Sequence, residues 1–282
     1  MKASVAAEYS QASAQLVHAT ALYIATKLGD LRDDLVIVGG LVPSLIVPQS
    51  TSAADLPVHV GTMDVDLGLA VGILDHERYH ELCHRLRSAG FKADRNDAGK
   101  ATNQRWCIES EGRRVTVDFL IPATLEGDKG GKLRNLESDF AAIITPGLEL
   151  AFLDRRLVTL EGKTLRHEQA IREVYVCEAG AFTVLKALAF EGRGENKDAY
   201  DLIYVLQNYG RNVAEVFDRL KPLLSNVFAK RAVEILERDF ERADSVGIIR
   251  HAEFLGNKGD ETIRADAAGA VRSLLQLCRG TS

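Results

Sequence analysis

One short run restricts the fold more than any other: VHVGTMDVDLGLAVG, residues 58–72. It consists mostly of apolar residues and glycine, which predicts a buried strand, yet it carries Asp64 and Asp66. Successive strand side chains point to opposite faces, so the aspartates share one face, ~6.5 Å apart at ~3.3 Å per residue, and Val65 points into the core. Two such carboxylates repel each other unless a cation neutralises them. The pair therefore predicts a cation site, unless it lies on a solvated strand face or caps a turn.

A second predicted strand, residues 113–122, carries a third acid. Asp118 lies between two apolar residues, a setting that disfavours a lone carboxylate. If this strand lies beside the first, three carboxylates converge on a site suited to Mg²⁺, which binds oxygen ligands and substrate phosphates. Such sites align an attacking hydroxyl with a phosphoryl group. Alternatively, Asp118 forms a salt bridge with Arg113 or Arg114.

Two glycines precede these acids in the chain. Gly39 and Gly40 follow a predicted strand, Leu35–Val38, and precede a predicted helix over residues 41–47. Backbone N–H groups at a helix start can bind phosphate, and glycines allow close approach, although the same pattern also forms simple tight turns. Ser44 offers a hydroxyl to phosphate or metal, or packs within the helix.

Composition and charge exclude some protein classes. The 282 residues are 46% hydrophobic and 27% charged, typical of a globular protein with a sizeable core. A net charge of −5 gives no global basic field for nucleic acid. No apolar run predicts a membrane span, and the N-terminus lacks a signal-peptide core. The four cysteines have no zinc-like spacing, and free thiols are typical of the cytoplasm, where we expect the protein.

The order of predicted elements indicates an α+β protein with two domains. Residues 1–177 alternate between predicted helices and strands, and residues 178–282 read as helices. The further predicted helices of the first domain are residues 8–29 and 76–91, and its further predicted strands are residues 101–110, Leu157–Leu160 and Glu173–Cys177. Residues 126–135 are expected to form a loop.

The glycine pair, the Met63-Asp64-Val65-Asp66-Leu67 strand and Asp118 resemble the DNA-polymerase-β-type nucleotidyltransferase superfamily. Within it, the stretch FTVLKALAFEGRGENKDAYDLIYVL is similar to the AbiEii-like toxins of type IV toxin–antitoxin systems. The resemblance covers roughly residues 30–210. It departs in the long loop over residues 48–57, and in Thr62-Met63, where the family has a serine.

The resemblance implies a nucleotidyltransferase-type mixed β-sheet flanked by helices and a Mg²⁺-dependent transfer of NMP from an NTP to an acceptor hydroxyl. Asp64, Asp66 and Asp118 would hold the metal, Asp118 would also accept the hydroxyl proton, and Gly39 and Gly40 would cradle phosphates. A tRNA acceptor and a cognate antitoxin are the partners that the family suggests. Two alternatives stay open: a small-molecule acceptor, as in aminoglycoside nucleotidyltransferases, and a non-catalytic binding protein of the same fold.

A lysine and two aspartates stand out in the C-terminal half. Lys186 is the one charge in an apolar predicted helix, so it needs a partner. Asp198 and Asp201 are three residues apart and share a helix face. Either they form a structural salt bridge with Lys186, or Lys186 reaches the triphosphate while an aspartate orients it or the acceptor; both can hold together. Arg193 and Lys197 could meet phosphate but are more typical of a solvated turn.

Two other patterns favour structural readings. Histidines at 76, 80 and 84 have metal-like helical spacing, but the helix is polar, which favours a solvated face. Trp106 could stack on a base, although core packing is the better interpretation.

Overall fold

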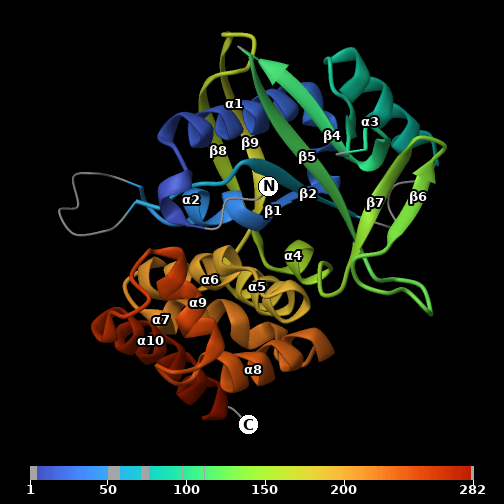
Figure 1. Ribbon diagram of the computed structural model, residues 1–282. Helices are drawn as coiled ribbons and strands as arrows, with labels where there is room; N and C mark the ends of the chain where they lie inside the picture. Colours follow the sequence, from blue (N-terminus) through green and yellow to red (C-terminus); the bar gives the residue numbers. More distant parts are fainter. Residues whose placement is uncertain (1–4, 50–57, 71–75, 97, 111, 281–282) are drawn as a thin grey trace. The chain divides into compact units, whose positions relative to one another are not determined.

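The computed structural model describes residues 5–49, 58–70, 76–96, 98–110 and 112–280 (Figure 1). Helices and strands are mixed as far as Cys177 and only helices follow, so the predicted α+β class with a helical C-terminal region is confirmed. The strands are β1 (Leu35–Val38), β2 (Asp64–Leu69), β3 (Lys92–Arg95), β4 (Ala101–Ser110), β5 (Arg113–Pro122), β6 (Leu133–Glu137), β7 (Phe140–Thr145), β8 (Arg155–Lys163) and β9 (Gln169–Cys177). The α-helices are α1 (Gln11–Lys27), α2 (Val42–Ile46), α3 (His76–Ser88), α4 (Leu150–Leu153), α5 (Ala179–Arg193), α6 (Asn196–Asn208), α7 (Val213–Leu220), α8 (Val227–Phe240), α9 (Val246–Phe254) and α10 (Glu261–Arg279). Short 3₁₀ turns are η1 (Ala6–Glu8), η2 (Gly29–Asp34), η3 (Gly39–Leu41) and η4 (Lys221–Leu223).

The chain forms two compact units. The sheet unit comprises Gln11–Leu41 and Thr62–Cys177, and the helical unit comprises Met1–Ser10, Val42–Gly61 and Glu178–Ser282. The chain therefore changes unit at Cys177–Glu178, the junction at which we divided the sequence. Two earlier segments also group with the C-terminal helices, since α2 packs against α6.

The described strands of the sheet unit form one mixed nine-stranded sheet. Seven strands follow the order β3-β4-β5-β2-β1-β9-β8, while β7 pairs with β5 and β6. The β2–β5, β5–β7 and β1–β9 pairs are parallel, and the other pairs are antiparallel. Strand β5 therefore lies directly beside β2, as the predicted meeting of the three acids requires.

Helix α1 covers one face of the central strands. Val65 and Leu67 of β2 line a small apolar cavity together with Ile24 of α1 and Leu28, the residue after α1, and all four are buried. The alternation that buries Val65 and Leu67 turns the aspartates of β2 to the opposite face. Burial of apolar side chains thus fixes the register that presents the acids.

The expected strand over residues 58–72 is shorter in the structure and begins at Asp64. The segment before it cannot continue the strand, because Gly61 has a φ of +84°. The last residues of the run, like residues 50–57 of the long loop, lie outside the described residues. The side chain of His76 lies outside them too, and His80 and His84 are exposed as expected.

The predicted strands over Leu35–Val38, residues 101–110 and residues 113–122 are confirmed with the same bounds, as β1, β4 and β5. The two short strands over Leu157–Leu160 and Glu173–Cys177 are parts of a longer hairpin, β8–β9, which is paired over nine residues of each strand. Strands β3 and β7 were not predicted, and β6 occupies the end of the expected loop over residues 126–135. Polar side chains on β3, β6 and β8 interrupt the alternation of apolar and polar residues that predicts a strand. Trp106 is buried against Phe119 and Phe140, so its core role is confirmed.

The helical unit is built around α5, which contacts α6, α7 and α8. Glu178 caps its N-terminus by accepting a hydrogen bond from Ala179 N–H, and Gly194 ends it in the left-handed conformation at φ +62°. Helix α6 starts two residues later and packs against α5 and α9.

Among the described helices, none combines the length and the apolar character needed to cross a bilayer.

Candidate metal centre and the buried charge network

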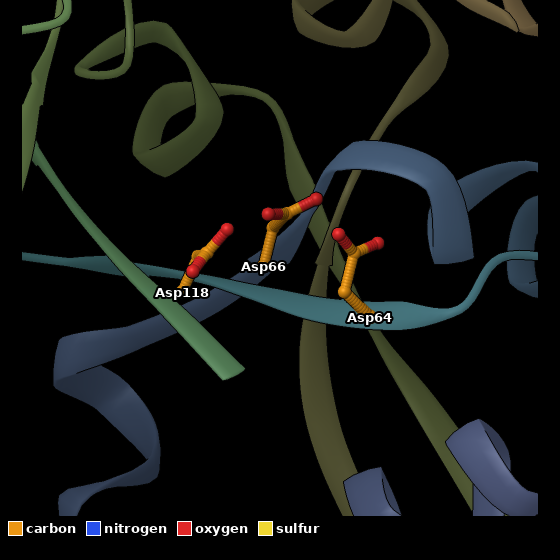
Figure 2. A group of neighbouring side chains, drawn as sticks. All are labelled: Asp64, Asp66 and Asp118. Carbon is orange, nitrogen blue, oxygen red and sulfur yellow. The ribbon is translucent and has the colours of Figure 1, made fainter. Parts of the chain in front are cut away.

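Three carboxylates from two adjacent strands meet on one face of the sheet (Figure 2). Asp66 of β2 lies directly opposite Asp118 of β5 in the parallel register, and Asp64 is two residues away on the same side. One oxygen of each carboxylate lies within 4.8 Å of the others. Asp118 is buried, whereas the other two are partly exposed. The predicted convergence is confirmed, and these three residues can hold a metal ion.

The glycine pair makes room for this cluster. Gly39 has a φ of +70°, and a Cβ there would lie 1.9 Å from Oδ2 of Asp66. A Cβ on Gly40 would lie 2.8 Å from the hydroxyl oxygen of Thr62. Any side chain at Gly39 would therefore displace the Asp66 carboxylate. The predicted contact of these glycines with phosphate stays a prediction.

Thr62 orients the first aspartate. Its buried hydroxyl donates a 2.8 Å hydrogen bond to Oδ1 of Asp64. The resembled family has a serine just before its first aspartate, where this chain has Thr62-Met63. The sequence did not show whether a hydroxyl acts at this position. The hydroxyl therefore fixes one of the two carboxylate oxygens of Asp64.

Asp118 forms its salt bridge with Arg105 of β4 rather than with Arg113 or Arg114. Arg105 lies directly opposite Asp118 across the β4–β5 ladder. Its Nε donates to Oδ1 at 2.6 Å, and its Nη2 donates to Oδ2. The hydrogen bond with Asp118 raises the pKa of the Arg105 guanidinium, and the negative charges of all three acids add to this shift. Asp118 therefore belongs to the acid cluster and also forms a salt bridge, so the two interpretations are true together.

The helical unit contains a second charged cluster, which we call the buried charge network. Lys186, Lys197, Asp198 and Asp201 form its enclosed part, and the half-exposed Arg193 joins it from the surface. Lys186 Nζ donates to Asp198 Oδ1 at 2.9 Å and to Asp201 Oδ2 at 2.7 Å. Arg193 binds both oxygens of Asp198 at 2.6 and 2.7 Å. The structural salt bridge predicted for Lys186 is thus present. Its contact with a triphosphate stays a prediction.

Charges inside the network stabilise one another. Burial alone would raise the pKa of Asp201, but the positive charges of Lys186 and Lys197 outweigh it and hold that pKa well below its usual range. Burial alone would lower the pKa of Lys186, and the two aspartates reverse this shift. Lys197, expected in a solvated turn, pairs with Asp201 and lies 5.5 Å from the ring centre of Tyr200. It is therefore a part of the core.

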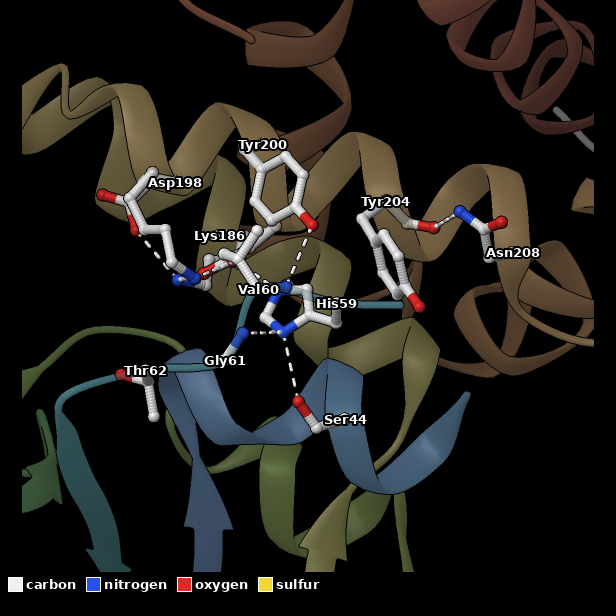
Figure 3. A network of polar contacts seen from close by, with 12 residues as sticks. Ser44, His59, Val60, Gly61, Thr62, Lys186, Asp198, Tyr200, Tyr204 and Asn208 are labelled. Carbon is white, nitrogen blue, oxygen red and sulfur yellow. Dashed lines mark hydrogen bonds and ion pairs between the residues drawn. The ribbon is translucent and has the colours of Figure 1, made fainter. Parts of the chain in front are cut away.

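His59 belongs to the same network and was missed from the sequence (Figure 3). Its Nε2 lies 2.8 Å from Asp201 Oδ1, and its Nδ1 accepts a 3.1 Å hydrogen bond from Gly61 N–H. Since a backbone N–H can only donate, the ring proton is assigned to Nε2, which donates to Asp201. Burial, supported by the charge of Lys197, lowers the pKa of His59 to about 4, so the ring is neutral at pH 7.

Ser44, a candidate for phosphate or metal binding, also contacts this histidine. Its Oγ lies 3.1 Å from Nδ1 of His59, within the helical unit. The signal that could have revealed His59 is a histidine between two valines, because a buried imidazole needs partners. Its partner Asp201 lies 142 residues further along the chain, a distance that local patterns do not bridge.

No family model matches the chain, and no curated protein matches it significantly. The resemblance to nucleotidyltransferases therefore rests on the sequence motifs.

Proposed function

We propose that the protein is a Mg²⁺-dependent nucleotidyltransferase that transfers NMP from an NTP to an acceptor hydroxyl and releases pyrophosphate. The observation that carries the proposal is the register of β2 and β5, which brings Asp64, Asp66 and Asp118 within 4.8 Å of one another. All three offer carboxylate oxygens, the ligands that Mg²⁺ prefers.

Two features of the chain support this donor set. Thr62 holds Asp64 by a hydrogen bond, and Gly39 leaves space for the Asp66 carboxylate. The ligands therefore stand on strands and are fixed by neighbouring groups, as precise metal sites require. When bound, Mg²⁺ would supply charge neutralisation for the phosphates and a template for the attacking hydroxyl.

In the proposed reaction, the acceptor oxygen forms a bond to the α-phosphorus while the bond from that phosphorus to the β-phosphate oxygen breaks. Pyrophosphate leaves with the bonding electrons. The hydroxyl proton passes to a carboxylate oxygen of Asp118. Asp64, Asp66 and Asp118 would hold the metal, Asp64 and Asp66 would also orient the triphosphate, and Gly39 and Gly40 would present backbone N–H groups to phosphate.

The test is transfer from radiolabelled NTPs in the presence of Mg²⁺, with total tRNA or a panel of small hydroxyl-bearing acceptors. We expect label on one acceptor class with the wild type, and none with Asp66→Asn. Asp33→Asn is the matched control, because this exposed aspartate of the sheet unit lies outside the acid cluster; it should transfer at the wild-type rate.

The outcomes separate the candidate functions. Label on tRNA supports the toxin-like activity, and label on a small molecule supports the aminoglycoside-type alternative. Full transfer by Asp66→Asn contradicts the metal assignment. If no acceptor is labelled and Mg²⁺ with NTP does not raise the melting temperature, a non-catalytic binding protein is favoured.

A further inference from the structure

Arg105 holds the one buried carboxylate of the acid cluster. It forms a row with Asp118 and Asp66 across strands β4, β5 and β2. Both oxygens of Asp118 accept hydrogen bonds from its guanidinium. The side chain of Asp118 is only 8% exposed, whereas that of Arg105 is 32% exposed. The carboxylate of Asp118 is thus enclosed, whereas the side chain of Arg105 is in contact with solvent.

A carboxylate gripped in this way is a poorer metal ligand than a free one. Charge-assisted, two-point Arg–carboxylate pairs are among the stronger ion pairs. A divalent cation must share the same two oxygens and also approach a positive charge. We propose that Arg105 competes with a divalent cation for Asp118, so that the affinity of the cluster depends on release of the guanidinium. This inference rests on the proposed metal site.

The position of Arg105 in the sheet is suited to such release. The Arg105–Asp118 pair is the last in the β4–β5 ladder, and β7 takes over as the partner of β5 from Leu120 onward. The side chain of Arg105 therefore stands where β4 leaves β5. A phosphate group offers the guanidinium a second two-point partner of greater negative charge. Arrival of a triphosphate would draw Arg105 from Asp118 and so strengthen metal binding.

The size of the effect follows from the fraction of molecules in which Asp118 is released. The apparent dissociation constant equals the intrinsic one divided by that fraction. If the pair is closed in about nine molecules of ten, its removal tightens metal binding roughly tenfold. Arg105→Lys keeps the charge but loses the two-point grip, so its affinity should lie between those of the wild type and Arg105→Ala.

The experiment measures Mn²⁺ binding to the full chain without nucleotide, by electron paramagnetic resonance of the free ion. The variants are Arg105→Ala, Asp118→Asn and the double variant, each checked for folding by circular dichroism. We expect Arg105→Ala to bind Mn²⁺ about tenfold more tightly than the wild type. In the Asp118→Asn background, the same change should have little effect, because Arg105 acts through Asp118. The charge control is Arg95→Ala, an exposed arginine of β3 that should not alter Mn²⁺ binding.

Each other outcome contradicts a specific statement. Equal Mn²⁺ affinity of wild type and Arg105→Ala overturns the competition and leaves the proposed metal site standing. An increase that persists in the Asp118→Asn background also overturns it, in favour of a general charge effect on the cluster. Absence of Mn²⁺ binding in every variant, Arg105→Ala included, overturns both the inference and the metal site.

Discussion

The two aspartate clusters of this protein look alike in the sequence and differ in their charge balance. Both place aspartates two or three residues apart among apolar neighbours. In the helical unit, three cations face Asp198 and Asp201, so these five residues carry one net positive charge when His59 is neutral. In the sheet unit, three carboxylates and Arg105 carry two net negative charges.

This difference distinguishes a structural cluster from a cation site. A buried charge network is tolerated when its own members satisfy it, and removal of one member leaves the rest uncompensated. A cluster with a surplus of negative charge gains from an external cation, and its acids repel one another until one binds. Three predictions test this contrast.

The largest expected effect is on stability. Asp201→Asn leaves Lys186 and Lys197 buried without a carboxylate that they share, so we expect the free energy of unfolding to fall by about 3–5 kcal/mol. Asp66→Asn removes one of several charges that repel one another. It should therefore change the free energy of unfolding by less than about 1 kcal/mol. Urea unfolding of both variants with a chelator present measures the difference. Equal losses would contradict the contrast.

A somewhat smaller effect concerns pH. The pKa of His59 is about 4 in the folded protein and 6.5 ordinarily, so the unfolded chain binds the proton more readily. The stabilisation is complete above pH 6.5 and is lost as the pH falls toward 4, by up to about 3 kcal/mol. His59→Gln should therefore show a flatter fall in unfolding free energy between pH 7 and pH 4.5.

The quantity to compare is the slope of the unfolding free energy against pH. Its absolute value is not informative, because His59→Gln also loses hydrogen bonds. Burial lowers the pKa of His251 to about 4 as well, and that contribution remains in both proteins. Exposed His84→Gln is the control and should keep the wild-type slope. An unchanged slope in His59→Gln would show that its ring does not titrate as described.

The smallest expected effect on stability separates backbone strain from displacement of a ligand. Gly39→Ala and Gly112→Ala both place a side chain at a φ near +70°, at a cost of roughly 1–3 kcal/mol each. The added Cβ of Gly112 meets nothing within 4 Å, whereas that of Gly39 would collide with Asp66. Only Gly39→Ala should weaken Mn²⁺ binding. If both variants bind Mn²⁺ as the wild type does, Gly39 does not shape the site.

Much of the acid cluster could be predicted because it depends on local alternation. Asp64 and Asp66 had to share a face once Val65 was buried, and Asp118 had the same apolar setting in a second strand. The predicted ion pair of Lys186 followed equally from burial of a charge in an apolar helix. The salt-bridge partner expected for Asp118 was wrong. Arg113 and Arg114 are near Asp118 in sequence, whereas its actual partner, Arg105, lies opposite it in the β4–β5 ladder.

The sequence by itself determined which residues carry charge inside apolar elements, because burial and alternation are properties of short segments. The tertiary structure decided which of these charges meet wherever the sequence left the partner open. The register of β2 with β5, the grip of Arg105 on Asp118 and the pairing of His59 with Asp201 join residues far apart in the chain. Such contacts depend on how the elements pack, and local patterns of residues do not encode that packing.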